Sequence, residues 1–359
     1  MSDLEVRRES ELSAEECKRF ASPALKHHAL YARHSTERTQ AFMAKVYRSG
    51  RLLGLAPVIR MARFRATLLL EPEVRRRLDP WMGPFARKTT YLVDTSFMGF
   101  QYAQPFLVLD PADFETVRGA VVAHLRASTD AATLMVFEPL GDPSWSRALG
   151  AGQFKSLPYV HADLSGCATT DDYLVKLDQK RRKNWRSDRR VFEREGGSFE
   201  VHEPPLAPEL VRTLHGCLIQ SSEKNAELTV PYQDLMLHPG AFAEASQTAV
   251  VARVDGQVAG FFAGFRNGDV FQQCHGGFNY AHAHRLKAYP NLINASIEHA
   301  ISLGCRELTM GPLNNEAKRR AGRMMPMMAS WWSRGALDRF LMRRLLLERM
   351  QFHQGSLEN

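Results

Sequence analysis

The chain has 359 residues, of which 44% are hydrophobic and 24% charged. These values are ordinary for a globular protein, and the length allows two domains with a substantial core. The formal net charge of +8 fits an anionic partner, such as nucleic acid, a phosphate-bearing cofactor or a membrane surface, without choosing among them. A basic protein with no nucleic-acid role is the open alternative.

The five cysteines are widely spaced and form no CxxC pair. This argues against a disulfide framework or a zinc knuckle and for a reducing compartment. The N-terminal stretch is polar and lacks the apolar core of a signal peptide. No run approaches the roughly 20 apolar residues that a membrane-spanning helix needs. We therefore expect a cytoplasmic protein, with peripheral membrane contact as an option.

The first half of the chain predicts a mixed lobe of strands and helices. Residues 40–63 hold two apolar runs around a Ser-Gly-Arg turn, which is the pattern of a β-hairpin. Strand-like runs follow within residues 90–109. Residues 113–126 predict a helix, because four apolar residues recur on one face. The continuous apolar run 132–137 predicts a buried strand.

A long basic helix is predicted over residues 170–195. Asp171 and Asp172 suit the positive end of the helix dipole, and Gly196-Gly197 should stop the helix. The basic segment 180–190 is either a solvated helix face or a surface for nucleic-acid or phosphate groups.

The second half predicts a helix over residues 208–222 and then a three-stranded meander over residues 248–274. Asp255-Gly256 and Asn267-Gly268 provide strong hairpin-turn chemistry between its strands. A closing strand is expected at residues 324–333. Residues 336–352 form a basic amphipathic segment, which either docks on protein or lies on anionic lipid.

Function is expected to centre on residues 270–325. They read as a strand, a loop, a helix from near Pro290 to Gly304, a strand, and a basic loop. A helix whose N-terminus faces a gap between two strands offers unpaired N–H groups to an anion. Basic residues flank that gap on both sides: Arg285, Lys287, Lys318, Arg319 and Arg320.

The two halves echo each other in three short matches that occur in the same order. Both have a hairpin whose second strand opens with glycine. Gly99–Ala103 (GFQYA) resembles Gly277–Ala281 (GFNYA), and Glu138-Pro139-Leu140 resembles Gly311-Pro312-Leu313. A tandem duplication is our preferred explanation.

This arrangement resembles the GNAT acyltransferase fold. The run KLDQKRRKNWRSDRRVFEREGG resembles the helix before the second lobe in the Fem-like and cellulose-biosynthesis-type acyltransferases, and PNLINASIEHAISLGCRELTMGPLNNEAKRRAG resembles their C-terminal signature. The resemblance implies an α/β fold with mixed sheets and two tandem GNAT-like lobes. The expected segments are an N-terminal lobe (1–165), a basic connecting helix (166–197), a C-terminal catalytic lobe (198–335), and an amphipathic helix with a tail (336–359).

The resemblance further implies an N-acyltransferase, with the acyl donor between strands 270–274 and 306–310 and an amine of a small molecule, sugar or peptide as acceptor. The donor is acyl-CoA or another carrier; the loop HRLKAYPN lacks the usual glycines. Two alternatives stay open: a Fem-like transferase that uses aminoacyl-tRNA bound along the basic helix, and a non-catalytic adaptor with a decayed GNAT fold.

Candidate site residues follow from these expectations. A base is needed to remove the ammonium proton, and His275, at the end of a strand, or Glu223, after a helix, could serve; Tyr289 is a candidate proton donor. Each of the three could instead be a structural residue. The donor would contact Arg285, Lys287, Asn291, Lys318 and Arg319. No metal site is expected, because no carboxylate or cysteine lies at ligand spacing from His282 and His284.

Overall fold

The computed structural model describes residues 3–20, 22–65, 87–93, 106–139, 152–224, 238–245, 247–283, 287–311 and 315–336. The strands of the first lobe are β1 (Leu4–Glu9), β2 (Thr39–Arg48), β3 (Arg51–Arg65), β4 (Arg87–Val93), β5 (Leu107–Val108) and β6 (Thr133–Pro139). Its helices are α1 (Ala14–Phe20), α2 (Pro23–Arg33), the 3-10 turn η3 (Pro111–Asp113) and α4 (Phe114–Ala127).

The strands of the second lobe are β8 (Gly197–His202), β9 (Thr248–Val254), β10 (Gln257–Asn267), β11 (Val270–Phe278) and β12 (Glu307–Met310). Its helices are α6 (Thr170–Lys176), α7 (Gln179–Arg194), α8 (Pro208–Lys224), α10 (Pro239–Glu244), α11 (Tyr280–Ala283), α12 (Ala288–Ser302) and α13 (Asn315–Lys318). Two long strands, β7 (Gly152–Asp163) and β13 (Arg323–Ser333), lie between the lobes.

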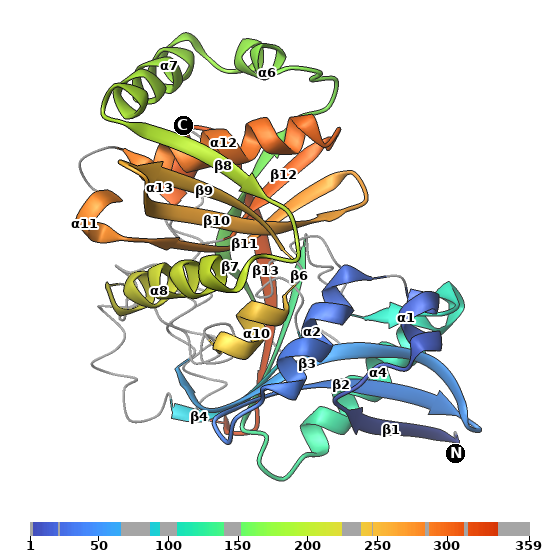
Figure 1. Cartoon of the computed structure of the whole chain (residues 1–359). Coiled ribbons are helices and arrows are strands. Elements are labelled where there is room, and N and C mark those ends of the chain that lie inside the picture. Colours follow the sequence, from blue (N-terminus) through green and yellow to red (C-terminus); the bar gives the residue numbers. More distant parts are fainter. Residues whose placement is uncertain are drawn as a thin grey trace.

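The described strands form one continuous mixed sheet in the order β1-β2-β3-β4-β6-β13-β7-β12-β11-β10-β9-β8, with β5 beside β3. Two pairs are parallel, β4 with β6 and β11 with β12, and the others are antiparallel. The helices lie against this sheet at both ends (Figure 1). The expected α/β fold with two related lobes is confirmed.

The lobes exchange their closing strands. β7 precedes the second lobe in sequence yet pairs with β12, and β13 follows the second lobe yet pairs with β6 of the first. β7 and β13 also pair with each other, so the hydrogen-bonded ladder is unbroken from one lobe to the other. The expected boundaries near residues 165 and 335 stay predictions.

The hairpins occur where the turn residues placed them. β2 and β3 pair around Ser49-Gly50, both of which have positive φ. β9, β10 and β11 form the expected meander through Asp255-Gly256 and Asn267-Gly268. A left-handed backbone at these positions favours Gly, Asn and Asp, which explains why local sequence was sufficient.

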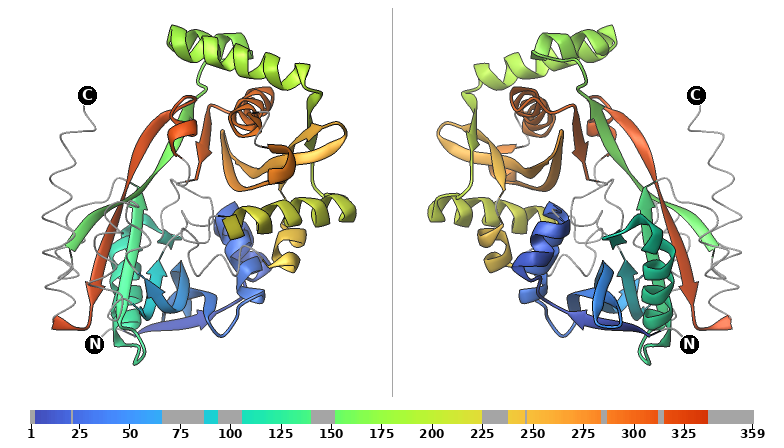
Figure 2. Two further views of the ribbon diagram at one scale, coloured as in Figure 1. Left: turned by 90° about the vertical axis from the view of Figure 1, so that its left-hand side faces the viewer. Right: turned by 90° about the vertical axis from the view of Figure 1, so that its right-hand side faces the viewer.

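The basic connecting segment is two helices and not one. α6 ends at Lys176 and α7 begins at Gln179. Between them Leu177 is extended, and the Asp178 side chain accepts a hydrogen bond from the Arg181 backbone N–H at 2.8 Å. Aspartate at an N-cap satisfies such an orphan donor, so Asp178 starts a new helix. Figure 2 shows both helices at the rim of the second lobe, with α7 above α12.

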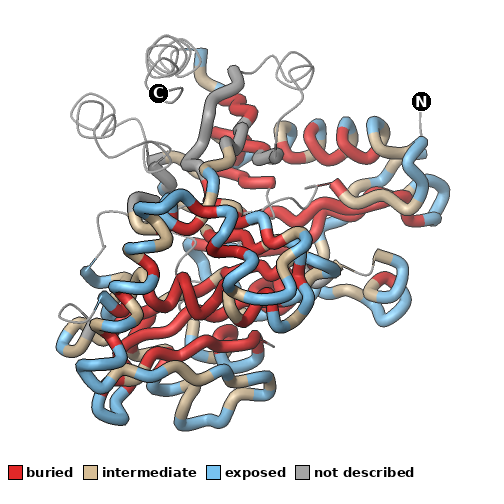
Figure 3. The backbone as a smooth tube through the Cα atoms, turned by 90° about the horizontal axis from the view of Figure 1, so that it is seen from above, coloured by how far each residue is buried: buried red, intermediate tan, exposed pale blue. Residues whose placement is uncertain are grey.

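Helices cover the second-lobe sheet on opposite faces. On one face α12 packs with Phe271, Leu308 and Met310 in a single core. On the other, α8 and α10 pack against alternate residues of β9 and β10. Because successive side chains of a strand point to opposite faces, these two cores assign each residue of β12, and each residue of β11 up to Gln273, to a side. Figure 3 shows the buried positions along the central strands.

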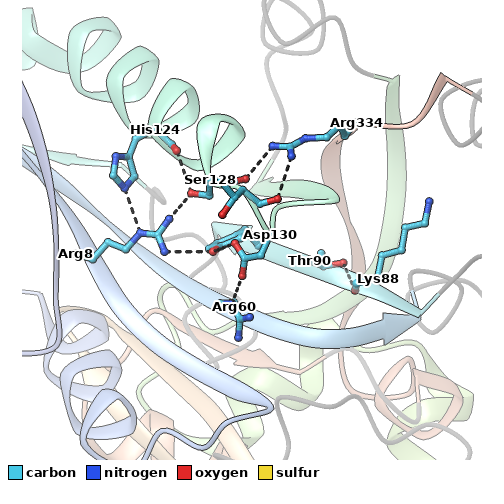
Figure 4. Close-up of polar contacts among 10 residues, drawn as sticks. Arg8, Arg60, Lys88, Thr90, His124, Ser128, Asp130 and Arg334 are labelled. Atoms are coloured by element: carbon cyan, nitrogen blue, oxygen red, sulfur yellow. Dashed lines mark hydrogen bonds and ion pairs between the residues drawn. The ribbon is translucent and has the colours of Figure 1, made fainter.

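Near the C-terminus of α4, several polar side chains of the first lobe form hydrogen bonds with one another (Figure 4). Arg8 donates to His124 Nε2 at 3.2 Å and to the Ser128 hydroxyl. Asp130 accepts from Arg60 Nε at 2.7 Å and from the Tyr91 hydroxyl at 2.8 Å. These contacts join β1, β3, β4 and α4. The cationic groups here are thus engaged in holding the lobe together.

No helix in the described ranges is long and apolar enough to cross a bilayer. The predicted amphipathic segment beyond Ala336 and the repeat segment 99–103 lie outside the described residues.

Candidate functional site

The site is organised by the separation of β11 and β12. These parallel strands pair over four residues, from Val270 with Glu307 to Gln273 with Met310. β12 ends there, whereas β11 continues to Phe278 beside β10. A bulge in β11 leaves Cys274 between two consecutive pairs with β10, and a bulge bends its strand. Beyond it, the other edge of β11 has no strand beside it in the described part of the sheet.

The N-terminus of α12 is held by α7. Lys287 caps α12 with a left-handed backbone (φ 52°), and its ammonium group donates to the buried carboxylate of Asp188 on α7. The Asn291 side-chain amide donates to the backbone carbonyls of Asp188 (3.0 Å) and Lys287 (3.2 Å). α12 begins at Ala288, two residues before Pro290. Of the predicted donor contacts, Lys287 and Asn291 are brought together; Arg285 lies outside the described residues.

Tyr289 lies on the α12 face of the sheet. Its half-buried ring makes an edge contact with Phe262 (centroids 5.4 Å apart) and a tilted contact with Phe278 (5.2 Å). These contacts hold the ring against the end of β11. Its role as a proton donor stays a prediction.

His275 lies on the opposite face, where the first lobe contacts the second. Its Nδ1 is 2.6 Å from Gln247 Oε1, and its Nε2 is 3.1 Å from the Tyr31 hydroxyl on α2. Because a carbonyl oxygen only accepts, Nδ1 carries the proton and Tyr31 donates to Nε2. Burial lowers the pKa of His275 to about 4, so the ring is neutral at pH 7. A base with so low a pKa accepts a proton weakly, and its catalytic role stays a prediction.

Lys318 and Arg319 follow β12 on α13 and its C-terminal end. The Lys318 ammonium is buried and donates to the Gly311 carbonyl at 2.6 Å, directly after the end of β12. Burial lowers its pKa to about 7, so it exchanges a proton near neutrality. Arg319 is exposed, with Nε 2.5 Å from Met324 Sδ. α13 packs on α12, which places Lys318 on the α12 face.

Glu223 is exposed near the end of α8. The segment that follows it lies outside the described residues, so the structure does not bring Glu223 to the separation of β11 and β12. Within the described ranges, no group of three or more His, Cys, Asp or Glu is placed to hold a metal ion.

Three residues at this site were not predicted from the sequence. Tyr31 and Gln247 are distant from His275 in the chain, and only folding brings them together. Asp188 stands alone within a basic run, where an acidic residue looks like ordinary surface. A local clue was available only for Asp188, since a lone carboxylate among cations on a predicted amphipathic helix favours an internal salt bridge.

Comparisons with known proteins agree with this geometry. Residues 179–319 match the model of the acetyltransferase (GNAT) domain. Similar solved structures include L-PGS from Bacillus licheniformis (TM-score 0.55, 12% identity, covering 93% of this chain and 95% of that one). Another is the C-terminal domain (DUF2156) of a candidate lysylphosphatidylglycerol synthetase from Agrobacterium fabrum (0.54, 14%, 91% and 94%). FemX is a third (0.51, 9%, 86% and 96%). A search of curated proteins found no match.

The second lobe therefore has the fold and the sequence pattern of a GNAT acyltransferase domain. The solved structures share the fold of nearly the whole chain, both lobes included. The expectation of an acyltransferase enzyme is confirmed.

Proposed function

We propose that this protein is an N-acyltransferase that holds a carrier-bound acyl group between β11 and β12 and transfers it to an amine. The observation that carries the proposal is the end of strand pairing at Gln273 and Met310, directly before the bulge at Cys274. Backbone N–H groups along the unpaired edge of β11 are suited to stabilise an oxyanion, because they are fixed before the reaction begins.

The proposed reaction is nucleophilic acyl substitution. The amine nitrogen attacks the acyl carbonyl carbon, a C–N bond forms, and the bond from carbon to the carrier sulfur or oxygen breaks. The ammonium proton must leave before attack, and the carrier leaves as thiol or hydroxyl. Lys318 is suited to accept or return a proton, since its pKa is about 7. His275, Glu223 and Tyr289 stay candidates for the same task.

The donor is proposed to be a coenzyme A thioester of a small acyl group. Its phosphates would lie at the N-terminus of α12, where backbone N–H groups and Lys287 favour an anion, and Lys318 and Arg319 would flank it. Isothermal titration of the full chain with thioesters of increasing acyl length tests this. Lys287→Met should weaken binding about tenfold, and Lys183→Met on exposed α7 should not. Lack of binding at every length would reject the donor.

A second candidate, transfer from aminoacyl-tRNA, is favoured by the surface of α7. Lys180, Lys183 and Arg190 are exposed on this helix at spacings of three and seven residues. Among the described residues, the ion pairs of α7 involve its other charged side chains. Spacings of three, four and seven place residues on one helix face, so these cations form a stripe. A row of cations can follow a phosphate backbone and releases counterions on binding. The likeness to FemX and L-PGS supports the fold only.

The tRNA candidate has its own test. Replacing the three cations of the stripe with glutamine should lower tRNA affinity and reduce the slope of log K against log salt by ~0.7–0.9 for each lost phosphate contact. Glutamine at exposed Arg194, which contacts Glu195, is the matched control. Affinity that does not depend on salt would exclude tRNA as donor.

Two further proposals rest on sequence and composition. A cytoplasmic location is supported by the five free cysteines. Weak contact of residues 337–352 with anionic lipid would appear as liposome co-sedimentation that is lost when the chain ends at Gly335.

A further inference from the structure

A row of polar side chains crosses the sheet just before β11 and β12 separate. Gln272 on β11 pairs in register with Thr309 on β12, and Thr309 pairs with His161 on β7. Their neighbours Phe271, Leu308 and Val160 belong to the core beneath α12. Because strand residues alternate in direction, the row lies on the opposite face, which is also the face of His275 and Tyr31.

Two members of this row each carry a buried side-chain oxygen that has no hydrogen-bond partner among the described residues. Gln272 is 2% exposed and Thr309 is fully buried. In the part of the chain that the structure describes, the oxygens without a partner are Gln272 Oε1 and Thr309 Oγ1. Unsatisfied buried polar groups are uncommon and destabilising, so a pair of them on adjacent strands calls for an explanation.

The first lobe shows that the fold does not require polar residues here. Its parallel strands also pair over four residues, from Thr90 with Thr133 to Val93 with Val136. Counted back from the last pair, the position of Gln272 and Thr309 is held by Leu92 and Met135. The next strand contributes Trp331 where the second lobe has His161.

The correspondence is supported by which side chains face the helix. In the first lobe Tyr91, Val93, Leu134 and Val136 face α4, as Phe271, Leu308 and Met310 face α12. Leu92 and Met135 are fully buried on the other side. The same two strand positions therefore carry apolar side chains, Leu92 and Met135, in the first lobe and polar side chains, Gln272 and Thr309, in the second.

We propose that Gln272 and Thr309 receive the amine group of the acceptor. Both oxygens accept hydrogen bonds from N–H groups, as an ammonium or amine requires. On the same face, Glu307 Oε2 lies 3.5 Å from His161 Nε2 and supplies a carboxylate to balance an ammonium charge. The proposed phosphate contacts Lys287 and Lys318 lie on the α12 face, so the second substrate would approach from the opposite face.

The inference rests on the proposed function and specifies its second substrate as a primary amine that enters from the face shared with α2. Tyr31 on α2 reaches His275 on this face, so both lobes contribute to the surface. Gln272 and Thr309 form the pair directly before the last pair of β11 and β12. An amine bound there would lie next to the place where the donor carbonyl is proposed to lie.

The test measures amine binding to the full chain. Ethanolamine, glucosamine and spermidine are titrated by NMR, with ethylene glycol and glucose as amine-free controls. We expect at least one amine, and neither control, to bind. The variant Gln272→Leu/Thr309→Met, which installs the first-lobe pair, should weaken that binding at least tenfold. Its melting temperature is measured alongside, so that a loss of folding is distinguished from a loss of binding.

Thr309→Val is the second variant if the double substitution does not fold, and Thr133→Val in the first lobe is its matched control. Amine binding that is equal in wild type and Thr309→Val overturns the inference, and so does the absence of amine binding to wild type. Titration with coenzyme A thioesters separates the two proposals. If the wild type binds thioesters, and the variants bind the amine as tightly as the wild type does, the proposed function stands and this amine site is rejected.

Discussion

Lys318 offers a quantitative test of the electrostatics at the end of β12. Its ammonium is buried, and burial lowers its pKa from 10.5 to about 7. At about 1.4 kcal/mol per pKa unit, this corresponds to a penalty on the charged form of about 5 kcal/mol. Lys318→Met removes that penalty but leaves the Gly311 carbonyl without its donor, which costs about 1–3 kcal/mol. The variant should therefore be a few kcal/mol more stable than wild type at pH 6.5.

The stability difference between wild type and Lys318→Met should depend on pH in a definite direction. Above pH 10.5 the lysine is neutral in both folded and unfolded chains, so it carries no penalty. As pH falls, the unfolded chain takes up the proton first, and stability is lost until the folded pKa near 7 is reached. The advantage of Lys318→Met over wild type should thus shrink by about 2 kcal/mol between pH 7 and pH 9 and change little below pH 7.

Urea unfolding of wild type and Lys318→Met at constant ionic strength, from pH 6 to pH 9, measures this difference. Lys183→Met on the exposed face of α7 is the matched control and should show no pH-dependent difference. A stability difference for Lys318→Met that stays constant across this range would refute the reasoning, because it would mean that the folded lysine keeps an ordinary pKa.

Three further changes test individual contacts. Gly277→Ala should lower the free energy of unfolding by about 1–3 kcal/mol, since its Cβ would lie 2.5–2.8 Å from the α8 backbone; unchanged urea stability would contradict this packing. Tyr31→Phe leaves the buried Nε2 of His275 without a donor, so thermal unfolding should show a loss of about 1–2 kcal/mol. Asp188→Asn should weaken the link between α7 and α12 by about 1 kcal/mol, given that Lys287 is half exposed, and hydrogen exchange should quicken at the start of α12; unchanged protection there would argue against the link.

The sequence predicted the features that depend on local chemistry. Turn pairs such as Asp255-Gly256 fixed the meander, because few residues adopt its left-handed backbone. Gly304, with φ of 69°, ends α12 as expected. The break between α6 and α7 was missed, since Leu177 continues the helical composition and Asp178 looks like one more charged residue.

Long-range features could not be predicted in this way. Nothing within β7 or β13 shows that each pairs with a strand of the other lobe, because pairing depends on partners more than a hundred residues away. The similarity between the two halves was visible in the sequence, but the residue-by-residue alignment of one half with the other was not. The short match sets Glu138-Pro139 against Gly311-Pro312, whereas the last parallel pairs end at Val136 and Met310, one residue out of step.

The site residues show the same difference between local and long-range features. Lys287, Asn291 and Lys318 were predicted because basic or polar residues flank a helix N-terminus, which is a local pattern. Their partners were not found, because the Asp188 carboxylate and the Gly311 carbonyl acquire meaning only through contact.

The similarity of the two lobes explains why one of them is the better candidate for chemistry. In the first lobe, Asp130 binds both Arg60 and Tyr91, and Leu92 and Met135 fill the position before the strands end. The Leu92 and Met135 side chains carry no oxygen or nitrogen that could bind a substrate there. In the second lobe the same position holds two oxygens that have no hydrogen-bond partner among the described residues, which costs stability. A duplicated fold can carry that cost in one copy because the other copy, joined through β7 and β13, continues the sheet without interruption.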